Sequence, residues 1–382
     1  MFNDQELGPN ASLIGRPGSR ASLMTPALVL DLDILERNVQ RMKKFAEEHN
    51  IALRPHCKTH KSIAIARLQM EAGALGISAA TLGEAQVMVG ASIPGVLVTS
   101  PIIADAKVDA LMALNGQAEG LMQTVDNIQN LRSLDAAAGQ VGLPMNVVID
   151  VDVGLHRTGA AAASDAVELV EAAVASENLT YSGVQGYAGQ IMHIEKFADR
   201  RNTNIAHTQP LIDACAVLAE KNLPPAIVTG AGTGTYDIDS KLGVMSEMQV
   251  GSYVVMDVEY RDVQTATGDD WLFDPALFIR ATVVSANHDG HVTVDAGLKC
   301  FATDGPLPDF AAGVPVGASY SYFGDEHGRI AFAQANGRLT LGDAVECIVP
   351  HCDPTINLHD LYHCVRGDTL VDIWPVDARG FH

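Results

Sequence analysis

A segment rich in basic side chains near the start of the chain is the first candidate for chemistry: Arg54-Pro-His-Cys-Lys-Thr-His-Lys61. Successive side chains of a strand alternate between its faces, so Arg54, His56 and Lys58 would point the same way. Cationic neighbours lower the pKa of a lysine, which prepares its amine for Schiff-base chemistry. A solvated basic turn is the alternative interpretation. The pattern therefore makes Lys58 the candidate nucleophile, with His56 beside it.

A glycine-rich turn follows a later apolar run, in the sequence Thr229-Gly-Ala-Gly-Thr-Gly234. Glycines let backbone amides approach an anion closely, and the hydroxyl of Thr233 can donate a hydrogen bond. Such turns are common, so an ordinary tight turn is the alternative. Together with a Schiff-base lysine, the turn suggests pyridoxal 5′-phosphate (PLP), with its aldehyde on Lys58. Its phosphate is then expected near Thr229, Gly230, Gly232, Thr233 and Gly234.

Arg157 is a second cation in a polar segment that follows a predicted strand. It could form an ion pair with Asp150 or Asp152. Alternatively it lies near the ring nitrogen of the cofactor, where a permanent cation keeps that nitrogen unprotonated and weakens the ring as an electron sink. Tyr187 either packs on the same ring or is an ordinary aromatic residue at the mouth of the fold.

A candidate metal site lies late in the chain, in Pro350-His-Cys-Asp-Pro354. His351 and Asp353 are two positions apart, so in an extended chain they share one face. Imidazole and carboxylate suit Zn²⁺ or Mn²⁺, and Mg²⁺ is possible if waters fill the other positions. Cys352 would point away as a bystander.

The elements that must position these residues alternate between short apolar runs and helical patterns over residues 28–265. Repeated βα units imply a parallel sheet, and eight of them fit a TIM-type (β/α)8 barrel, whose active site lies at the carboxyl ends of the strands. A doubly wound open sheet is the alternative, but no GxGxxG follows the first strand. The eight predicted strands are 52–56, 76–80, 95–99, 120–125, 145–151, 181–186, 226–229 and 249–255.

The pattern changes after residue 265, where β-rich runs are bounded by Gly, Asp and Asn. This predicts a separate antiparallel β domain. The expected division is an N-terminal segment over 1–27 that joins the β domain, a barrel over 28–265 and the β domain over 266–382. A strand expected at 27–32 precedes the barrel proper and is a candidate to join it.

Composition excludes several classes of function. The chain has 382 residues, and its net charge of −21 disfavours nucleic acid and anionic membranes as partners. Six scattered cysteines without a CxxC pair favour a reducing compartment. No apolar run is long enough to span a membrane, and the first residues lack the features of a secretory signal, so a cytoplasmic location is expected.

With these motifs in view, the chain resembles the D-threonine aldolase / D-serine dehydratase-like family of fold-type III PLP enzymes, which are relatives of alanine racemase. The resemblance covers about residues 25–382. It rests on the lysine segment, the glycine turn, the metal motif and further matching segments at 150–159, 187–193, 247–253, 295–299 and 325–328.

The resemblance implies a PLP Schiff base at Lys58 and phosphate contacts from Gly232, Thr233 and Gly234, with Tyr253 nearby. It also implies a divalent metal on His351 and Asp353, which could be Mn²⁺, Mg²⁺, Co²⁺ or Zn²⁺. It further implies a homodimer.

The implied activity is cleavage of a D-3-hydroxy amino acid, such as D-threonine or D-3-hydroxyaspartate, to glycine and an aldehyde. His193 would accept the proton of the 3-hydroxyl. The aldolase branch tends to show His-x-Asp at the metal and the dehydratase branch His-x-Cys, so Asp353 favours the aldolase. A metal-activated dehydratase that acts on D-serine or D-threo-3-hydroxyaspartate is one alternative, and a non-catalytic PLP-binding protein is another.

Overall fold

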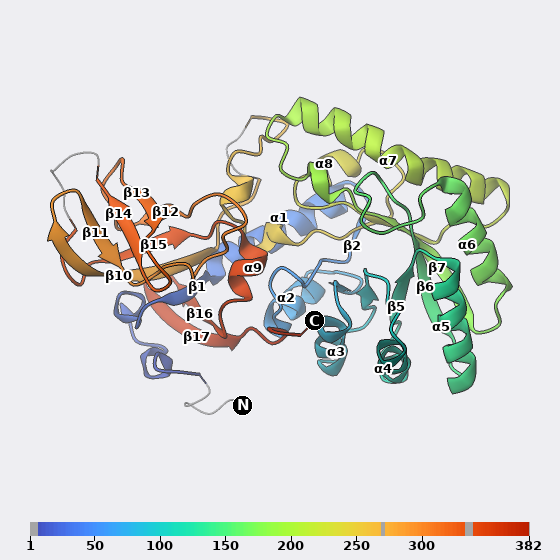
Figure 1. The fold of residues 1–382 in the computed structure, drawn as a ribbon, viewed down its shortest axis with the longest axis horizontal. Helices are drawn as coiled ribbons and strands as arrows, with labels where there is room; N and C mark the ends of the chain where they lie inside the picture. The colour runs from blue at the N-terminus through green and yellow to red at the C-terminus, as the bar shows by residue number, and fades with distance from the viewer. Residues whose placement is uncertain (1–6, 269–271, 333–338, 382) are drawn as a thin grey trace.

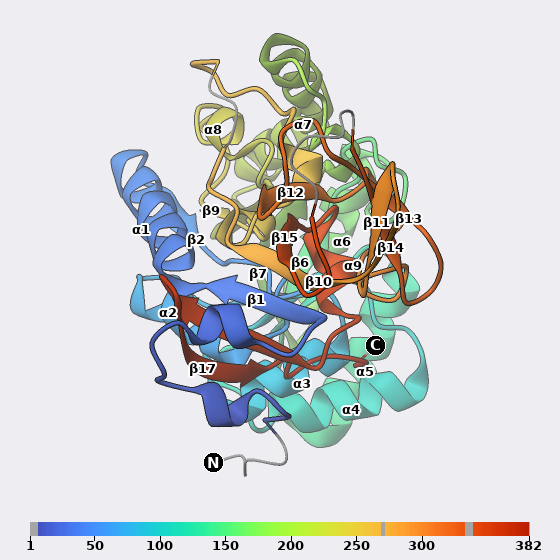
Figure 2. The same ribbon diagram turned by 90° about the vertical axis from the view of Figure 1, so that its left-hand side faces the viewer.

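The computed structural model describes residues 7–268, 272–332 and 339–381. Figure 1 shows a barrel on the right and an antiparallel sheet on the left, with helix α1 (Leu32–Glu48) running between them. In Figure 2 the sheet lies in front of the barrel. No helix in the described parts of the chain is both long and apolar enough to cross a membrane.

Eight parallel strands form the barrel in the order β2-β9-β8-β7-β6-β5-β4-β3. A parallel bridge between His56 and Ser78 joins the first and last strands of this order, which closes the ring. The predicted (β/α)8 architecture is therefore confirmed. The strands are β2 (Ala52–Leu53), β3 (Ser78–Ala79), β4 (Leu97–Val98), β5 (Met122–Val125), β6 (Met145–Asp150), β7 (Leu179–Gly186), β8 (Ile227–Gly230) and β9 (Glu247–Met248).

Helices surround the barrel, and their ends follow local sequence signals. Thr81 and Asn127 accept hydrogen bonds from backbone N–H groups of the first turns of α3 and α5, as N-cap residues do. Gly142 ends α5 in the left-handed region at φ 70°, where glycine has no steric penalty. The barrel helices are α2 (Ile63–Glu71), α3 (Leu82–Gly90), α4 (Asp105–Asn115), α5 (Ile128–Val141), α6 (Ala163–Ala175), α7 (Phe197–Glu220) and α8 (Tyr236–Asp239).

The second sheet has nine strands, mostly antiparallel, as the later part of the sequence predicts. The strand expected at 27–32 is β1, which pairs with β10 and β16 in this sheet and not with the barrel. The strands are β1 (Ala27–Asp31), β10 (Leu277–His288), β11 (His291–Val294), β12 (Asp309–Ala312), β13 (Ser319–Tyr322), β14 (Gly328–Ala331), β15 (Ala344–Ile348), β16 (Leu361–Arg366) and β17 (Thr369–Pro375), and helix α9 (Cys352–Ile356) follows β15.

The eighth barrel strand lies before the predicted range of 249–255. β9 ends at Met248, and the 3-10 turn η4 (Ser252–Val254) follows. The apolar residues after β9, such as Val254 and Met256, are buried, but in the cluster between barrel and sheet. An apolar run reports burial and not backbone geometry, which is why the pattern misplaces this strand.

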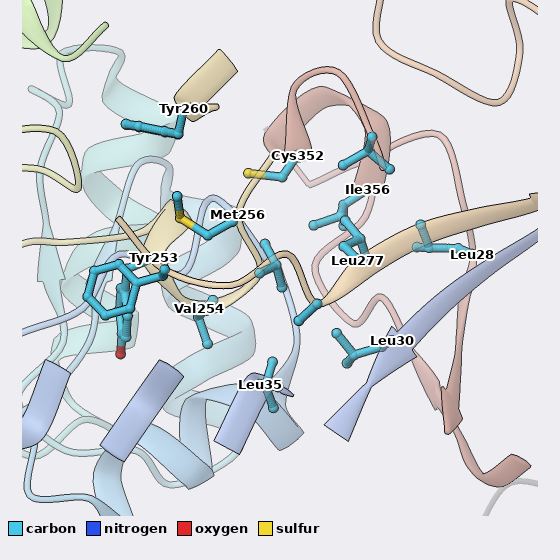
Figure 3. Close-up of a cluster of buried hydrophobic side chains, with 14 of the residues drawn as sticks. Leu28, Leu30, Leu35, Tyr253, Val254, Met256, Tyr260, Leu277, Cys352 and Ile356 are labelled. Atoms are coloured by element: carbon cyan, nitrogen blue, oxygen red, sulfur yellow. The ribbon is translucent and has the colours of Figure 1, made fainter. Parts of the chain in front are cut away.

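A hydrophobic cluster joins the two parts of the molecule. Leu30 of β1, Leu35 of α1 and Val254 after the barrel pack together with Leu277 of β10 and Ile356 of α9, and all five are buried (Figure 3). This shared core fixes the β domain against the barrel, so that α9 and the residues before it lie near the barrel mouth.

Candidate active site

A cavity of about 330 Å³ opens at the carboxyl ends of the barrel strands. Six of the residues predicted from sequence line it: His56, Lys58, Arg157, Tyr187, Gly232 and Thr233. An adjoining recess shares three of these, Lys58, Arg157 and Tyr187, and is also lined by His193, His351 and Asp353. The fold therefore brings the lysine segment, the glycine turn and the metal motif to one place.

The ammonium group of Lys58 forms an ion pair with Asp353, 295 positions away in the chain. Burial by itself lowers the pKa of a lysine, but the carboxylate of Asp353 outweighs it and holds the pKa of Lys58 above its ordinary value. Burial opposes ionisation of Asp353 too, yet Lys58 holds the pKa of that carboxyl well below its usual range. The expected lowering of the lysine pKa is therefore reversed by a residue that the local sequence does not reveal.

The other two side chains of the predicted cationic row add no net charge beside Lys58. Arg54 is buried and forms a bidentate ion pair with Glu247, with N–O distances of 2.7 and 2.9 Å. His56 is buried near Thr99, with 3.1 Å between Nε2 and Oγ1. Burial, followed by the charge of Lys58, lowers the pKa of His56 to about 3, so its imidazole is neutral at neutral pH.

The glycine turn meets the cavity at Gly232 and Thr233. A Cβ added to Gly232 would lie 2.6 Å from the sulfur of Met192, so the absence of a side chain permits this close packing. The backbone N–H of Tyr253 donates to the hydroxyl oxygen of Thr233 over 3.0 Å. That contact uses the oxygen of Thr233 and leaves its proton available for a ligand.

Four predicted phosphate contacts do not line the cavity. Thr229 is buried and accepts a hydrogen bond from Gln249, Gly230 pairs within the sheet, and Gly234 packs on the carbonyl of Met192. The side chain of Tyr253 is 1% exposed, and its hydroxyl accepts a hydrogen bond from Gln69 inside the hydrophobic cluster. Tyr253 therefore contributes its backbone amide to the turn. Its ring lies among the buried hydrophobic side chains drawn in Figure 3.

Arg157 lies with its guanidinium carbon 5.9 Å from the centre of the Tyr187 ring. Within the described residues no carboxylate forms an ion pair with it, because Asp152 pairs with His156 and Asp150 accepts a hydrogen bond from Thr158. Arg157 is thus an exposed cation directed at the cavity. Burial raises the pKa of Asp150, which lines the same cavity, to about 7.

A chain of acids and imidazoles borders the recess. Glu259 Oε2 lies 3.5 Å from His193 Nε2 and 3.8 Å from His351 Nδ1, which in turn is 2.9 Å from Asp304 Oδ2. Desolvation lowers the pKa of His193 to about 4, although 43% of its side chain is exposed, and burial raises the pKa of Glu259 to about 7. Burial opposes protonation of His351, but the carboxylates of Asp353 and Glu259 prevail and raise its pKa. The imidazole of His193 is therefore neutral at neutral pH and lies close to His351.

The donors at His351 and Asp353 fit a divalent cation chemically, because an imidazole and a carboxylate face the same recess. In the described parts of the chain, no three His, Cys, Asp or Glu side chains are grouped to hold a metal ion. The residues present therefore suit two protein ligands completed by water or substrate oxygens. Cys352 is buried in the hydrophobic cluster, as expected of a bystander (Figure 3).

Sequence reasoning missed several residues of the site. Gln185, Gln249 and Ser252 line the cavity, and Tyr260 borders both the cavity and the recess. Glu259 comes from the segment that links the barrel to the β domain. The run Asp257-Val-Glu-Tyr260, polar at alternate positions just after the last barrel strand, is a signal that could have pointed to this segment.

The fold and site define a barrel protein of the alanine racemase type. A model of the alanine racemase N-terminal domain matches residues 30–258, and a model of the putative serine dehydratase domain matches residues 276–365. The 3-hydroxy-D-aspartate aldolase of Paracoccus denitrificans is 36% identical over 99% of this chain and 98% of its own. The D-threonine aldolase of an Arthrobacter species is 33% identical over 94% of each chain.

A solved structure is similar over nearly the same length. The crystal structure of D-threonine aldolase from Filomicrobium marinum superimposes with a TM-score of 0.89 at 35% identity, over 94% of this chain and 96% of that one. The chain therefore belongs to the D-threonine aldolase / D-serine dehydratase-like family.

Proposed function

We propose that this protein is a PLP- and divalent-metal-dependent aldolase that cleaves D-3-hydroxy amino acids to glycine and an aldehyde. The observation that carries the proposal is the position of Lys58, which borders both the cavity with the glycine turn and the recess with His193, His351 and Asp353. The named activities of the aldolase relatives support the same reaction class.

PLP, when bound, would draw electrons from the bond that breaks at the amino-bearing carbon. The residues that would hold it are Lys58 through its amine and Gly232 and Thr233 through the phosphate. Thr233 suits this role because its hydroxyl oxygen is occupied by the amide of Tyr253 and its proton is free to donate. Arg157 has no carboxylate partner among the described residues and lies over the ring of Tyr187 at the cavity. It would face the PLP ring as a permanent cation.

His193 is the proposed acceptor of the 3-hydroxyl proton. Because desolvation and the neighbouring His351 lower its pKa to about 4, the imidazole is unprotonated at neutral pH and able to take a proton. His351 and Asp353 would hold the divalent cation, which supplies Lewis acidity in the recess. A cation drawn from Mn²⁺, Mg²⁺, Co²⁺ and Zn²⁺, a homodimeric assembly and a cytoplasmic location are further parts of this proposal.

A dehydratase is the competing function, since it would use the same groups to expel the 3-hydroxyl. Two features favour the aldolase: the carboxylate at Asp353 in place of a thiol, and the aldolase names of two relatives at 33–36% identity. A non-catalytic PLP-binding protein is disfavoured, because a PLP carrier has no use for a neutral His193 in one recess with His351 and Asp353.

Product identification tests the proposal. The purified protein, loaded with PLP, is given D-threonine or D-threo-3-hydroxyaspartate with Mn²⁺ or with a chelator. We expect glycine and an aldehyde, with loss of both on chelation and in Lys58→Ala. A 2-oxo acid and ammonia would instead assign the dehydratase reaction, and PLP binding without turnover would assign the carrier.

A further inference from the structure

Arg200 of α7 is the largest fully buried side chain of the described residues, with an exposed fraction of 0%. Its guanidinium donates to four backbone carbonyls: Nε to Gly234 over 2.7 Å, Nη1 to Ile194 over 2.6 Å and to Glu195 over 3.2 Å, and Nη2 to Gln264. In the described structure no carboxylate forms an ion pair with it. An arginine that satisfies carbonyls from separate segments holds them at fixed mutual distances.

The four carbonyls belong to three segments of the chain, and each segment carries part of the site. Ile194 and Glu195 directly follow His193, and Gly234 ends the turn that contains Thr233. Gln264 ends the link over 257–264, which joins the barrel to the β domain and contains Glu259. The segments also contact one another: the N–H of Gln264 donates to the carbonyl of Glu195 over 2.9 Å. Arg200 thus holds residues adjacent to His193 and Thr233, together with Gln264, five positions after Glu259. Among the described residues, no hydrogen bond joins Arg200 to the side chain of His193, Thr233 or Glu259.

Close packing at Gly234 shows how tightly these segments are joined. A Cβ at Gly234 would lie 2.1 Å from the carbonyl oxygen of Met192, the residue before His193. The glycine turn and the His193 loop therefore share a backbone contact, and Arg200 spans it from one side. Lysine has a single nitrogen, so it could hydrogen-bond the carbonyls of only one of the three segments. Arg200→Lys therefore keeps the positive charge but removes the hydrogen bonds that join the segments.

We propose that Arg200 is a positioning residue that fixes the His193 loop and the domain link relative to the glycine turn. The inference rests on the proposed function, because it assigns the turn to the phosphate and His193 to proton transfer. It predicts that phosphate binding at the turn and order in the His193 loop depend on each other through Arg200. A purely structural role predicts only a loss of stability.

The first test compares Arg200→Lys with Arg280→Lys. Arg280 is a suitable control because it is also largely buried and hydrogen-bonded, to Glu346 and to the carbonyl of Ala21, but lies in the β domain. For Arg200→Lys we expect the Kd for PLP to rise about tenfold, as for one lost hydrogen bond. Amide exchange over 192–195 should accelerate, and kcat of the PLP-saturated protein should fall about 100-fold. Arg280→Lys should change the melting temperature alone.

The inference is overturned if Arg200→Lys loses stability while its Kd for PLP and its exchange over 192–195 match those of the wild type. A second measurement needs no variant. In the wild-type protein, adding PLP should slow exchange at 192–195 and at Gln264 as well as at the turn. Protection confined to 229–234 would contradict the coupling. Absence of aldolase products from the wild type would reject the proposed function, and these exchange and affinity readouts would still decide the role of Arg200.

Discussion

Asp353 faces two possible cations, the ammonium of Lys58 and the proposed divalent metal. In the structure Lys58 neutralises this carboxylate. Attachment of PLP to the amine of Lys58 would remove that ammonium, so the two binding events should favour each other by linkage.

Replacement of Lys58 therefore has an effect that loss of a catalytic group does not predict. In the PLP-free protein, Lys58→Ala should bind Mn²⁺ about tenfold more tightly than the wild type, because the competing cation is gone. Titration followed by electron paramagnetic resonance of free Mn²⁺ measures this. The control is Lys299→Ala, which removes an exposed lysine paired with Glu326 in the β domain. Equal affinities for wild type and Lys58→Ala would contradict the competition.

His60 gives a prediction about acid stability. Burial lowers its pKa to about 4 in the folded protein, whereas an unfolded histidine takes up a proton near pH 6.5. Between these values the unfolded state binds the extra proton, so stability falls as the pH falls, by up to about 1.4 kcal/mol per pH unit. His60→Gln should lack this contribution. Urea unfolding at several pH values between 4 and 7 measures it, and identical slopes in the two proteins would refute it.

At the scale of elements, the segment after β2 that carries Lys58 is held by the β domain. Tyr362 of β16 donates its hydroxyl to the carbonyl of His60 over 2.6 Å, and Asn357 accepts from Lys61 over 3.0 Å. Asp377 accepts from the backbone N–H of Ile63 over 2.7 Å at the start of α2. The position of the proposed nucleophile thus depends on residues of the β domain that lie 296 to 314 positions later in the chain than their partners.

Tyr362→Phe tests this dependence. Removal of the hydroxyl leaves a buried carbonyl unpaired and should cost about 1–3 kcal/mol of stability. It should also weaken PLP binding. Tyr320→Phe is the matched control, because Tyr320 is also buried and donates to the carbonyl of Ala296 within the β domain over 2.7 Å. That variant should lose similar stability and keep the PLP affinity. Equal PLP affinities in both variants would show that the contact does not position Lys58.

Local sequence patterns predict the elements well but cannot predict contacts between distant ones. The βα alternation alone places most barrel strands. The pattern misplaces the eighth strand, because Val254 and Met256 are apolar through burial between the two domains. The Lys58–Asp353 pair and the burial of the Tyr253 ring depend on the docking of the β domain, which no local periodicity encodes.

At the scale of the whole molecule, the hydrophobic cluster in Figure 3 makes the barrel and the β domain one cooperative unit. We expect a single unfolding transition in urea, with the same midpoint by circular dichroism and by tryptophan fluorescence. Leu30→Ala, at a fully buried position of β1, should lower the unfolding free energy by about 2–5 kcal/mol and shift both signals together. Separate midpoints would show that the domains unfold independently.

The link over 257–264 forms backbone hydrogen bonds with both domains. It bonds to Val349 and Pro350 of the β domain, near the metal motif, and to Glu195 of the barrel, near His193. The double attachment of the link limits where the chains of two relatives could be recombined. A β domain exchanged between relatives would bring new recess walls to an unchanged cofactor barrel, and so could alter which substrate side chain is accepted. Because the link has backbone partners on both sides, a junction placed inside 257–264 would divide the link itself between two parent sequences. Recombination between family members is thus expected to tolerate junctions just beyond this link and to reject those within it.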